Sequence, residues 1–482
     1  MTKNLISGVG ATLLVSAAFA QKETSPNFVL ILLDDFGWSS LSAQMDKNIP
    51  DSRSDYFQTP NIDRLINRGM RFSNGYAAAA ISSPTRYSIQ SGMTPARINH
   101  IRVGQNTDHI DHAALLSIPR VLKNAHPDYL CAHYGKWHLG CDPSVMGYDA
   151  SDGPTSNMDG NRNILSRTPP PDHKSKDPKE TWLHINISKD PKAAFSITDR
   201  AVAFLEQRGE DKHPFYLQVS HYATHKEITS TQASYDKFNA LPRGNKHTHA
   251  TFAAMIWDTD RAIGRILDKL QQLGMMENTY LILMSDNGGV PFLPPNKKVS
   301  DAAGGYGENA PLQRGKWDLY EGGIRVPFAV AGPGIARESQ CDMAVISYDI
   351  LPTIAELSGY RQALPSHLDG VSFAGLLKGK APAGDRALYF HNPFKPSVGV
   401  NRPHSAIRMG DWKVIKYLDD GQLELYNLRD DIGEAQDLAK KEPERARELG
   451  KELDDYLSSV NALKYDPNVP TQKVGGVASQ SF

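Results

Sequence analysis

Four short stretches of the chain are almost wholly apolar, and each predicts a buried strand. They are Phe28 to Leu33 (FVLILL), Pro214 to Ser220 (PFYLQVS), Thr279 to Ser285 (TYLILMS) and Val326 to Gly334 (VPFAVAGPG). An unbroken apolar run suits a strand that is covered on both faces, as in a parallel sheet.

Segments with apolar residues at helical spacing lie between these strands. One helix begins at Thr59-Pro60 and ends at Gly69, and another begins at Ser196. A third lies within Ser347 to Gly359. The longest runs from about Thr251 to Leu273, with its apolar stripe at Met255, Ile256, Ile263, Ile266, Leu267 and Leu270. Strands that alternate with helices predict an α/β fold, with a large, mostly parallel sheet sandwiched by helices.

The pattern changes near Arg386, where short strands are separated by Gly, Asp and Pro turns. A charged helix follows from Glu442 to about Leu457. We therefore predict a catalytic α/β domain over residues 26–385 and a C-terminal α+β subdomain over residues 386–482, with a small antiparallel sheet and a helix. Cys141 to Pro191 is rich in Asp, Pro and Ser, and predicts a long loop over one end of the main sheet.

The N-terminus has the features of a cleavable signal peptide over residues 1–20. Lys3 precedes an apolar stretch, and Ala18-Phe19-Ala20 offers a small-x-small cleavage site. No other stretch is long and apolar enough to cross a bilayer. We expect a periplasmic or secreted bacterial protein without membrane insertion.

Charge and cysteine content narrow the classes of partner. The 482 residues include 53 basic and 54 acidic residues, a net charge of -1, which gives no electrostatic case for nucleic acid binding. Export permits disulfides, and Cys131, Cys141 and Cys341 allow either one bridge or three free thiols.

Oxygen-donor side chains follow two of the predicted strands: Asp34 and Asp35 after the first, and Asp286 and Asn287 after the third. Either pair alone is readily explained as a turn. Adjacent parallel strands, however, would bring both pairs together, and clustered carboxylates favour a bound cation. An all-oxygen set indicates Ca²⁺, with Mg²⁺ second because it tends to keep its waters.

Three further segments carry basic side chains. They are GKWHLG with Lys136 and His138, SHYATH with His221 and His225, and QRGKWDLYEGGIRVP with Lys316. Singly, each is more often a surface or structural residue. Lys136 and His138 alternate and are expected to point the same way. Together, the basic residues would complement a cation and a helix amino end in an anion site.

The segment ISSPTRYSIQSG, residues 81–92, could be a simple capped helix start, yet it matches a known signature. Ser82-x-Pro84-Thr85-Arg86, followed by Ser91-Gly92, resembles the core motif of type I sulfatases of the alkaline phosphatase superfamily, in its serine-type form. Similar motifs in the family's order are Asp34-Asp35, GKWHLG, SDNGG, GKWDLYEGGIRVP, YDILPTIAELSG, LDGVSF and ELYNLRDD.

The resemblance implies specific roles. Ser82 would be oxidised to formylglycine, whose hydrate carries two hydroxyls, and Asp34, Asp35, Asp286 and Asn287 would bind calcium together with residue 82. The other implied roles are as follows: Arg86 and Lys136 hold the modified side chain, His138 contacts the non-attacking hydroxyl and later takes its proton, Lys316 contacts a sulfate oxygen and His225 is the general acid for the leaving group.

Some positions depart from the family pattern. Ser82 stands where many relatives have cysteine, so a serine-competent, formylglycine-generating maturase is implied as a partner before export. Thr85 stands where Ser or Ala is commoner, which is tolerable. His225 lacks the proline that often precedes the acid, which makes His221 its rival.

The resemblance implies hydrolysis of sulfate esters on a sulfated glycan. Exo action at a terminal sugar is predicted separately, because the long loop could close the pocket behind one sugar residue. The alternatives are a phosphomonoester or phosphodiester hydrolase of the same superfamily and a non-catalytic glycan-binding relative. Gly140 to Pro191 and the stretch around Arg402 to Arg408 are expected to read the sugar. Arg402 and His404 are candidate sugar contacts, although a solvated loop explains both more simply. The motifs leave the glycan, the sulfate position and the oligomeric state open.

Overall fold

A computed structural model describes residues 25–168, 185–290, 309–381, 384–396 and 399–469. The predicted signal peptide, residues 1–20, lies outside these ranges. Within them, no helix combines the length and apolar character that a bilayer span requires. Cys131, Cys141 and Cys341 all carry free thiols.

The core of the fold is an eight-stranded sheet with the order β12-β2-β11-β10-β1-β8-β4-β5. Strands β10, β1, β8, β4 and β5 run parallel to one another, whereas β11 is antiparallel to both β10 and β2. The predicted mostly parallel sheet is therefore confirmed. The strands are β1 (Asn27–Leu33), β2 (Met70–Phe72), β4 (Leu130–Gly135), β5 (Ala150–Ser151), β8 (Phe215–Ser220), β10 (Thr279–Ser285), β11 (Phe328–Ala331) and β12 (Ser339–Cys341).

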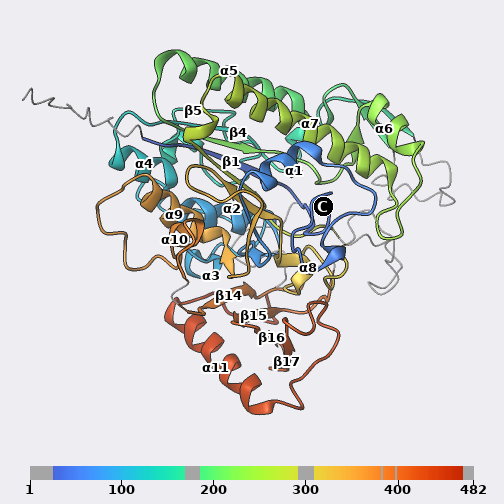
Figure 1. The fold of residues 1–482 in the computed structure, drawn as a ribbon. Coiled ribbons are helices and arrows are strands. Elements are labelled where there is room, and N and C mark those ends of the chain that lie inside the picture. Colours follow the sequence, from blue (N-terminus) through green and yellow to red (C-terminus); the bar gives the residue numbers. More distant parts are fainter. Residues whose placement is uncertain (1–24, 169–184, 291–308, 382–383, 397–398, 470–482) are drawn as a thin grey trace, which may run out of the picture.

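Helices cover both faces of this sheet (Figure 1). The side chains of Val29, Ile31 and Leu33 pack into the core on the α5 and α7 side, and those of the intervening residues pack into the core on the α2, α4 and α9 side. This two-sided burial explains the unbroken apolar run in β1. The helices are α1 (Pro60–Asn67), α2 (Ser82–Ser91), α3 (Pro95–Ile98), α4 (Ile118–Ala125), α5 (Ala194–Asp211), α6 (Gln232–Asn239), α7 (Ala250–Gln272), α8 (Glu321–Ile324), α9 (Ile350–Leu357) and α10 (Ala374–Leu377).

The segment predicted as one long loop, Cys141 to Pro191, contains short strands in its described part. Besides β5, they are β6 (Ile164–Thr168) and β7 (Ile185–Ser188). With β9 (Thr229–Ser230), they form a three-stranded sheet in the order β6-β7-β9. The prediction was wrong because these strands are too short to show a period and because β7 pairs with the distant β9.

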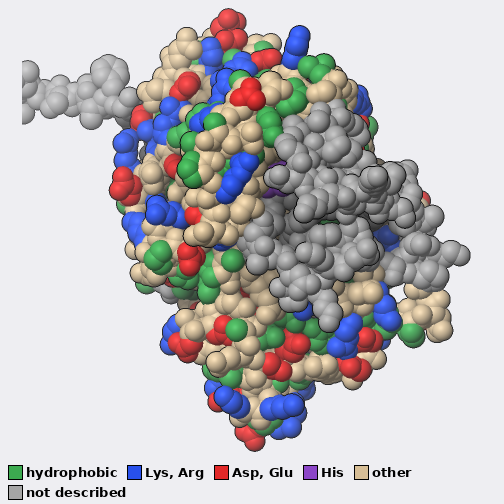
Figure 2. All heavy atoms as spheres, turned by 90° about the vertical axis from the view of Figure 1, so that its right-hand side faces the viewer, with side chains coloured by type: hydrophobic (Ala, Val, Ile, Leu, Met, Phe, Trp, Pro, Cys, Tyr) green, Lys and Arg blue, Asp and Glu red, His purple; other side chains and the backbone are tan. Residues whose placement is uncertain are grey.

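The C-terminal part forms the predicted small antiparallel sheet, which has four strands, with a helix packed on it. Apolar side chains of the sheet meet Leu449 and Leu453 of the helix. Basic and acidic side chains are interspersed over this part, at the bottom of Figure 2, as the charged sequence of the helix requires. The elements are β14 (Ala387–Asn392), β15 (His404–Met409), β16 (Trp412–Tyr417), β17 (Leu423–Asn427), α11 (Pro443–Ser459) and, elsewhere, the pair β3 (Gly75–Tyr76) and β13 (Val345–Ile346).

A buried charge network joins this sheet to the α/β part. Lys413 Nζ on β16 lies 2.9 Å from Glu321 Oε1 on α8 and 2.7 Å from Glu434 Oε1, and all three side chains are fully buried. Arg325 Nε donates to Glu321 Oε2 at 2.6 Å. Burial disfavours the Glu321 carboxylate, but Lys413 and Arg325 hold its pKa below its usual value. The contact between the two parts therefore depends on a buried cation that two carboxylates share.

Replacing Lys413 with methionine is expected to lower the free energy of unfolding by about 3–5 kcal/mol, because buried Glu434 loses its cation and buried Glu321 keeps only Arg325. The matched control is Lys416→Met on the same strand, whose partner Asp454 is half exposed. That variant should lose less than about 1 kcal/mol. Denaturant titration of both variants checks the difference, and equal small losses would contradict it.

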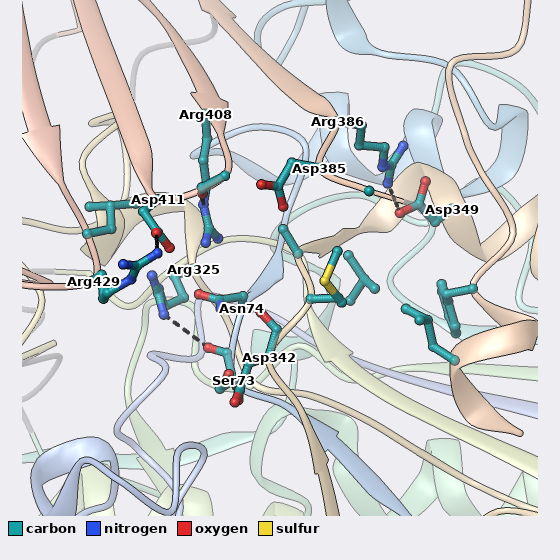
Figure 3. A pocket seen from close by; sticks show the side chains of 18 of the residues that line it. Ser73, Asn74, Arg325, Asp342, Asp349, Asp385, Arg386, Arg408, Asp411 and Arg429 are labelled. Carbon is teal, nitrogen blue, oxygen red and sulfur yellow. Dashed lines mark hydrogen bonds and ion pairs between the residues drawn. The ribbon is translucent and has the colours of Figure 1, made fainter. Parts of the chain in front are cut away.

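A cavity of about 1040 Å³ lies between the C-terminal sheet and the edge of the main sheet (Figure 3). Its lining includes four arginines, but carboxylates pair with three of them: Arg325 with Glu321, Arg386 with Asp349, and Arg429 with Asp411. The fourth, Arg408, donates to the hydroxyl of Tyr76 at 2.5 Å. Arg408 is the end of the stretch predicted to read the sugar, but none of the predicted catalytic or metal-binding residues lines this cavity, so the candidate chemistry lies elsewhere.

Candidate active site

The carboxyl ends of β1 and β10 bring the predicted oxygen donors together. The two strands are parallel neighbours, and Leu33 is in register with Ser285. Asp34 and Asp286 follow at the same sheet edge, where functional residues of open α/β sheets gather. One oxygen from each of Asp34, Asp35 and Asp286 lies within 4.8 Å of the others, and all three side chains are buried.

Each of these carboxylates is paired with a cation. Lys136 Nζ lies 2.7 Å from Asp34 Oδ2, and Lys316 Nζ lies 2.7 Å from Asp35 Oδ2. Arg86 approaches Asp286 Oδ2 at 2.9 Å through Nε, and its Nη1 donates to the Lys136 carbonyl at 2.5 Å. Charges buried this deeply persist only when they are paired and hydrogen-bonded.

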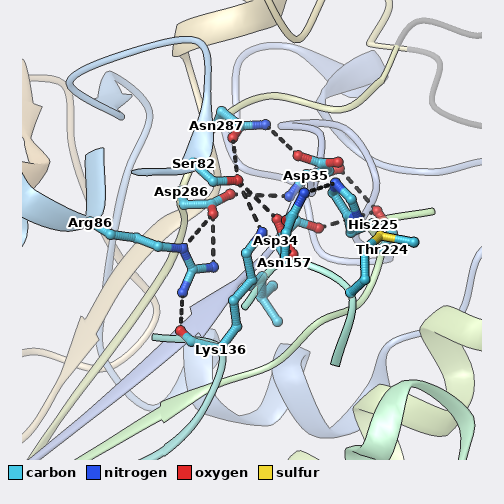
Figure 4. Close-up of polar contacts among 12 residues, drawn as sticks. Asp34, Asp35, Ser82, Arg86, Lys136, Asn157, Thr224, His225, Asp286 and Asn287 are labelled. Carbon is cyan, nitrogen blue, oxygen red and sulfur yellow. Dashed lines mark hydrogen bonds and ion pairs between the residues drawn. The ribbon is translucent and has the colours of Figure 1, made fainter. Parts of the chain in front are cut away.

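The second oxygen of each carboxylate is left to partners without charge (Figure 4). Asp34 Oδ1 accepts from Ser82 Oγ at 3.2 Å, and Asp35 Oδ1 accepts from Asn287 Nδ2 at 2.7 Å. Asn287 Oδ1 accepts from Ser82 Oγ at 3.3 Å, and Asp286 Oδ1 accepts from the Asp35 backbone at 3.2 Å. The atoms of these side chains that could bind a metal are therefore all oxygens, which fits a hard divalent cation.

The pKa values of Asp34 and Asp286 reflect both their burial and the charges around them. Burial raises the pKa of Asp34 to about 7, with Asp286 and Asp35 adding to the rise and Lys136 opposing it. Burial also disfavours the Asp286 carboxylate, but Arg86 and Lys136 hold its pKa below its usual value. A divalent cation among these groups would keep Asp34 ionised.

Ser82 is the first residue of α2 and points at this cluster. The N-cap is Ile81, and no side chain caps the helix, so the Ser82 hydroxyl is not used as a cap. Lys136 Nζ donates to Ser82 Oγ at 3.2 Å. The side chain is 2% exposed. A group at this position also feels the partial positive charge of the helix amino end.

The segment that carries Lys136 and His138 leaves the strand earlier than the alternation implied. Strand β4 ends at Gly135, whose φ is 98° and whose added Cβ would lie 2.0 Å from the Ser220 carbonyl. His138 has a φ of 57°. Strand alternation therefore does not orient these two side chains. Burial lowers the pKa of His138, with further lowering by Lys136, Arg86 and Lys316, which places His138 within the field of the same cluster.

His225, and not its rival His221, lies within the field of the site lysines. Burial lowers the pKa of His225 well below its usual value, and Lys316, Lys136 and Lys192 lower it further. His225 Nδ1 lies 2.9 Å from the Lys226 carbonyl, and Nε2 lies 3.2 Å from Asn157 Nδ2. For His221, burial alone lowers the pKa to about 4.

Arg402 and His404 have protein partners of their own. The Arg402 guanidinium pairs with Asp419 at 2.6 Å and Asp420 at 2.8 Å. His404 is buried, accepts from the Leu319 backbone through Nε2 at 3.0 Å, and meets the Arg402 carbonyl through Nδ1 at 2.7 Å. These contacts favour a structural role for both side chains.

Three residues near the site were not found from the sequence: Asn157, Asn161 and Lys192. Lys192 is 2% exposed and donates to Asn161 Oδ1 at 2.6 Å. All three come from the segment without periodicity or its end, where single Asn and Lys residues resemble those of any solvated loop. Only a three-dimensional arrangement could have identified them.

An α/β sheet that presents buried carboxylates, lysines and a helix-start hydroxyl at one edge defines a hydrolase of anionic esters. The Sulfatase family model matches residues 26–360, and the chain belongs to the sulfatase family. The model described as "N-sulphoglucosamine sulphohydrolase, C-terminal" matches residues 314–462. The protein is thus a type I sulfatase of the alkaline phosphatase superfamily and a sulfuric ester hydrolase.

Known proteins are similar over almost the whole chain. A sulfatase of Formosa agariphila is 27% identical, with 93% of each chain covered. The N-acetylgalactosamine-6-O-sulfatase of Bacteroides thetaiotaomicron is 25% identical over 90% of this chain and 93% of that protein. The structure of "Ps i-CgsB in complex with k-i-k-neocarrahexaose" superposes with a TM-score of 0.70 at 23% identity, covering 92% of this chain and 95% of that one, and shows the same fold.

Proposed function

We propose that this sulfatase removes sulfate ester groups from a sulfated glycan by exo action at a terminal sugar. The observation that carries the proposal is the placement of Ser82 Oγ, which lies 3.2 Å from both Asp34 Oδ1 and Lys136 Nζ in a buried site. Support for a sugar substrate comes from the N-acetylgalactosamine-6-O-sulfatase relative. The sulfatase must be exported to meet such a glycan, as the predicted signal peptide allows.

Ser82 is proposed to be converted to formylglycine by a serine-competent maturase before export. The position fits the modification, because oxygens of Asp34 and Asn287 and the ammonium of Lys136 already surround Oγ. A hydrated aldehyde supplies a stronger nucleophile than a serine hydroxyl, which needs activation. Asp34, Asp35, Asp286, Asn287 and residue 82 are the proposed Ca²⁺ ligands; calcium, when bound, supplies positive charge for the nucleophile and the sulfate.

The protein's own side chains bind the sulfate and move protons. Lys136 and Lys316 stabilise negative charge on the sulfate oxygens, and Arg86 holds Asp286 and the Lys136 segment in place. His138 contacts the non-attacking hydroxyl of residue 82 and later takes its proton, as sulfate leaves and the aldehyde reforms. His225 is the proposed acid for the leaving sugar oxygen, and its Nδ1 bonds the Lys226 carbonyl and fixes the ring. Its Nε2 is neutral in the free protein, because burial and the site lysines lower the pKa. The bound, negatively charged sulfate offsets those lysines, so Nε2 takes up a proton from solvent and then donates it to the leaving oxygen.

The proposed acid can be tested by varying the leaving group. His225→Ala should lower kcat about 10²- to 10³-fold on a sugar sulfate, because an alkoxide leaves poorly without a proton. On para-nitrophenyl sulfate the loss should be below about tenfold, because nitrophenolate needs little protonation. His221→Gln is the control, and a larger leaving-group effect in that variant would transfer the role to His221.

The reaction class and the exo mode have direct assays. With the sulfate ester and the phosphate ester of one phenol as substrates, the sulfate ester should be hydrolysed faster. Faster hydrolysis of the phosphate ester would overturn the proposal. Defined sulfated oligosaccharides should lose sulfate from the terminal residue first. Release of internal sulfate from intact polymer would contradict exo action.

A further inference from the structure

Lys192 is a buried cation that the proposed chemistry does not use. It belongs to a short 3-10 helix, η5 (Pro191–Ala193), directly before α5. Its side chain is 2% exposed, and its described hydrogen bond goes to the neutral Asn161 Oδ1 at 2.6 Å. Burying an ammonium without a paired carboxylate is unfavourable. Such a group requires an explanation in the native state.

The backbone at this point is also strained. Lys192 has a φ of 55° and Ala193 a φ of 53°, in the left-handed region that residues with a Cβ rarely adopt. Asp35, a member of the carboxylate cluster, and His138 have φ values of 58° and 57°. Strain of this kind persists only where the surrounding structure fixes it, and it gathers at functional sites.

A chain of contacts ties Lys192 to the leaving-group side of the site. Asn161, which accepts from Lys192, donates through Nδ2 to the Lys226 carbonyl at 3.3 Å, and that carbonyl also meets His225 Nδ1. Asn157, from the same segment, contacts His225 Nε2. Burial lowers the pKa of Lys192 to about 7, and the charge of Asp34 opposes that fall, which places the ammonium within the field of the carboxylate cluster.

We propose that Lys192 is a substrate-binding residue whose ammonium, held by Asn161, contacts an anionic oxygen of the bound substrate. The inference rests on the proposed function and adds a cation to Lys136 and Lys316. The anion is either the sulfate being removed or a second anionic substituent on the same sugar. Both supply the negative oxygens that the buried ammonium lacks in the free protein.

The test compares Lys192→Met with a matched control. Methionine keeps the length and burial of the side chain without its charge. Lys189→Met, three residues earlier and exposed, is the control. Asn161→Asp is a second variant: an aspartate there would pair with Lys192, which should hold or raise stability while it competes with the substrate anion.

Three measurements in the presence of Ca²⁺ separate the two sources of the anion. They are the Kd for inorganic sulfate by calorimetry, the KM for para-nitrophenyl sulfate, and the KM for a monosulfated and a disulfated form of one sugar. A contact with the transferred sulfate raises the sulfate Kd and every KM about 10- to 100-fold in Lys192→Met and Asn161→Asp. A contact with a second anion raises only the KM for the disulfated sugar.

Either pattern supports the inference. It is overturned if Lys192→Met and Asn161→Asp match Lys189→Met in the sulfate Kd and in every KM. It is also overturned if Asn161→Asp, with its thermal midpoint maintained, binds sulfate and the disulfated sugar normally. Failure of the proposed function looks different, because the wild-type protein, without any substitution, would then neither bind sulfate nor hydrolyse any sulfate ester.

Discussion

Replacing Ser82 with alanine is expected to lower kcat by more than about 10⁴-fold, the scale on which removal of a nucleophile acts. The expectation follows from the position of Oγ, which lies 3.2 Å from Asp34 Oδ1 and 3.3 Å from Asn287 Oδ1. Alanine cannot be oxidised to an aldehyde and offers no oxygen to the cluster. KM should change far less, because Lys136 and Lys316 still bind the sulfate.

Ser83→Ala is the matched control. Ser83 is the next residue of α2, and its hydroxyl meets His100 Nε2 at 2.6 Å, away from the carboxylates. The kcat of this variant should stay within about tenfold of the wild-type value, since the variant loses a buried hydrogen bond and no reacting group.

Mass spectrometry of the peptide that contains residue 82 links activity to the modification. Protein from a host with a serine-competent maturase should show a peptide lighter by two hydrogen atoms, and protein from a host without one should not. Turnover should scale with the modified fraction. Full desulfating activity with an intact hydroxymethyl group at residue 82 would end the formylglycine proposal.

The strands, the main helices and the C-terminal sheet were predictable because their signals are local. The apolar run in β10 and the stripe in α7 each determine one element, and the predicted bounds agree to within a residue. The convergence of Asp34 and Asp286 needed one further assumption, that the strands are parallel neighbours, and the register of β1 with β10 confirms it.

The less predictable parts depend on contacts between distant segments. Strand β7 exists because β9, more than forty residues later in the chain, pairs with it. The segment of His138 leaves the strand through positive φ values at Gly135 and at His138 itself, which no periodicity indicates. Lys192 stands out only through its burial and its bond to Asn161, which in turn contacts the Lys226 carbonyl. In each case the local sequence is ordinary and the tertiary structure supplies the information.

Replacing Asp34 with asparagine is expected to weaken Ca²⁺ binding at the carboxylate cluster and to lower turnover. Asp34→Asn keeps the size of the side chain and an oxygen for Lys136, but removes one of the three negative charges near the proposed cation. Ca²⁺ affinity should fall by more than about a hundredfold, because even outer-shell changes cost about 10- to 100-fold. Turnover should fall in parallel at limiting Ca²⁺.

Calorimetric titration of Ca²⁺ into chelator-treated protein measures this affinity without relying on activity. Ca²⁺ at about 100 times its Kd should raise the free energy of unfolding of the wild-type protein by about 2.7 kcal/mol, and Asp34→Asn should lose most of that gain. The control is Asp258→Asn, a buried carboxylate that accepts from Ser234 Oγ at 2.5 Å and from the Thr231 backbone. Its Ca²⁺ affinity should not change.

Removal of the metal distinguishes a catalytic role of the carboxylate cluster from a purely structural one. Lys136 and Lys316 pair with Asp34 and Asp35, so two of the three carboxylates have a protein cation that holds them in the folded state. Chelation should therefore abolish turnover while the protein stays folded, and Ca²⁺ should restore it better than Mg²⁺, which tends to keep its waters. If chelator-treated protein keeps full activity and no Ca²⁺ is found by titration, the three carboxylates are structural partners of the lysines and the catalytic role of the metal is wrong.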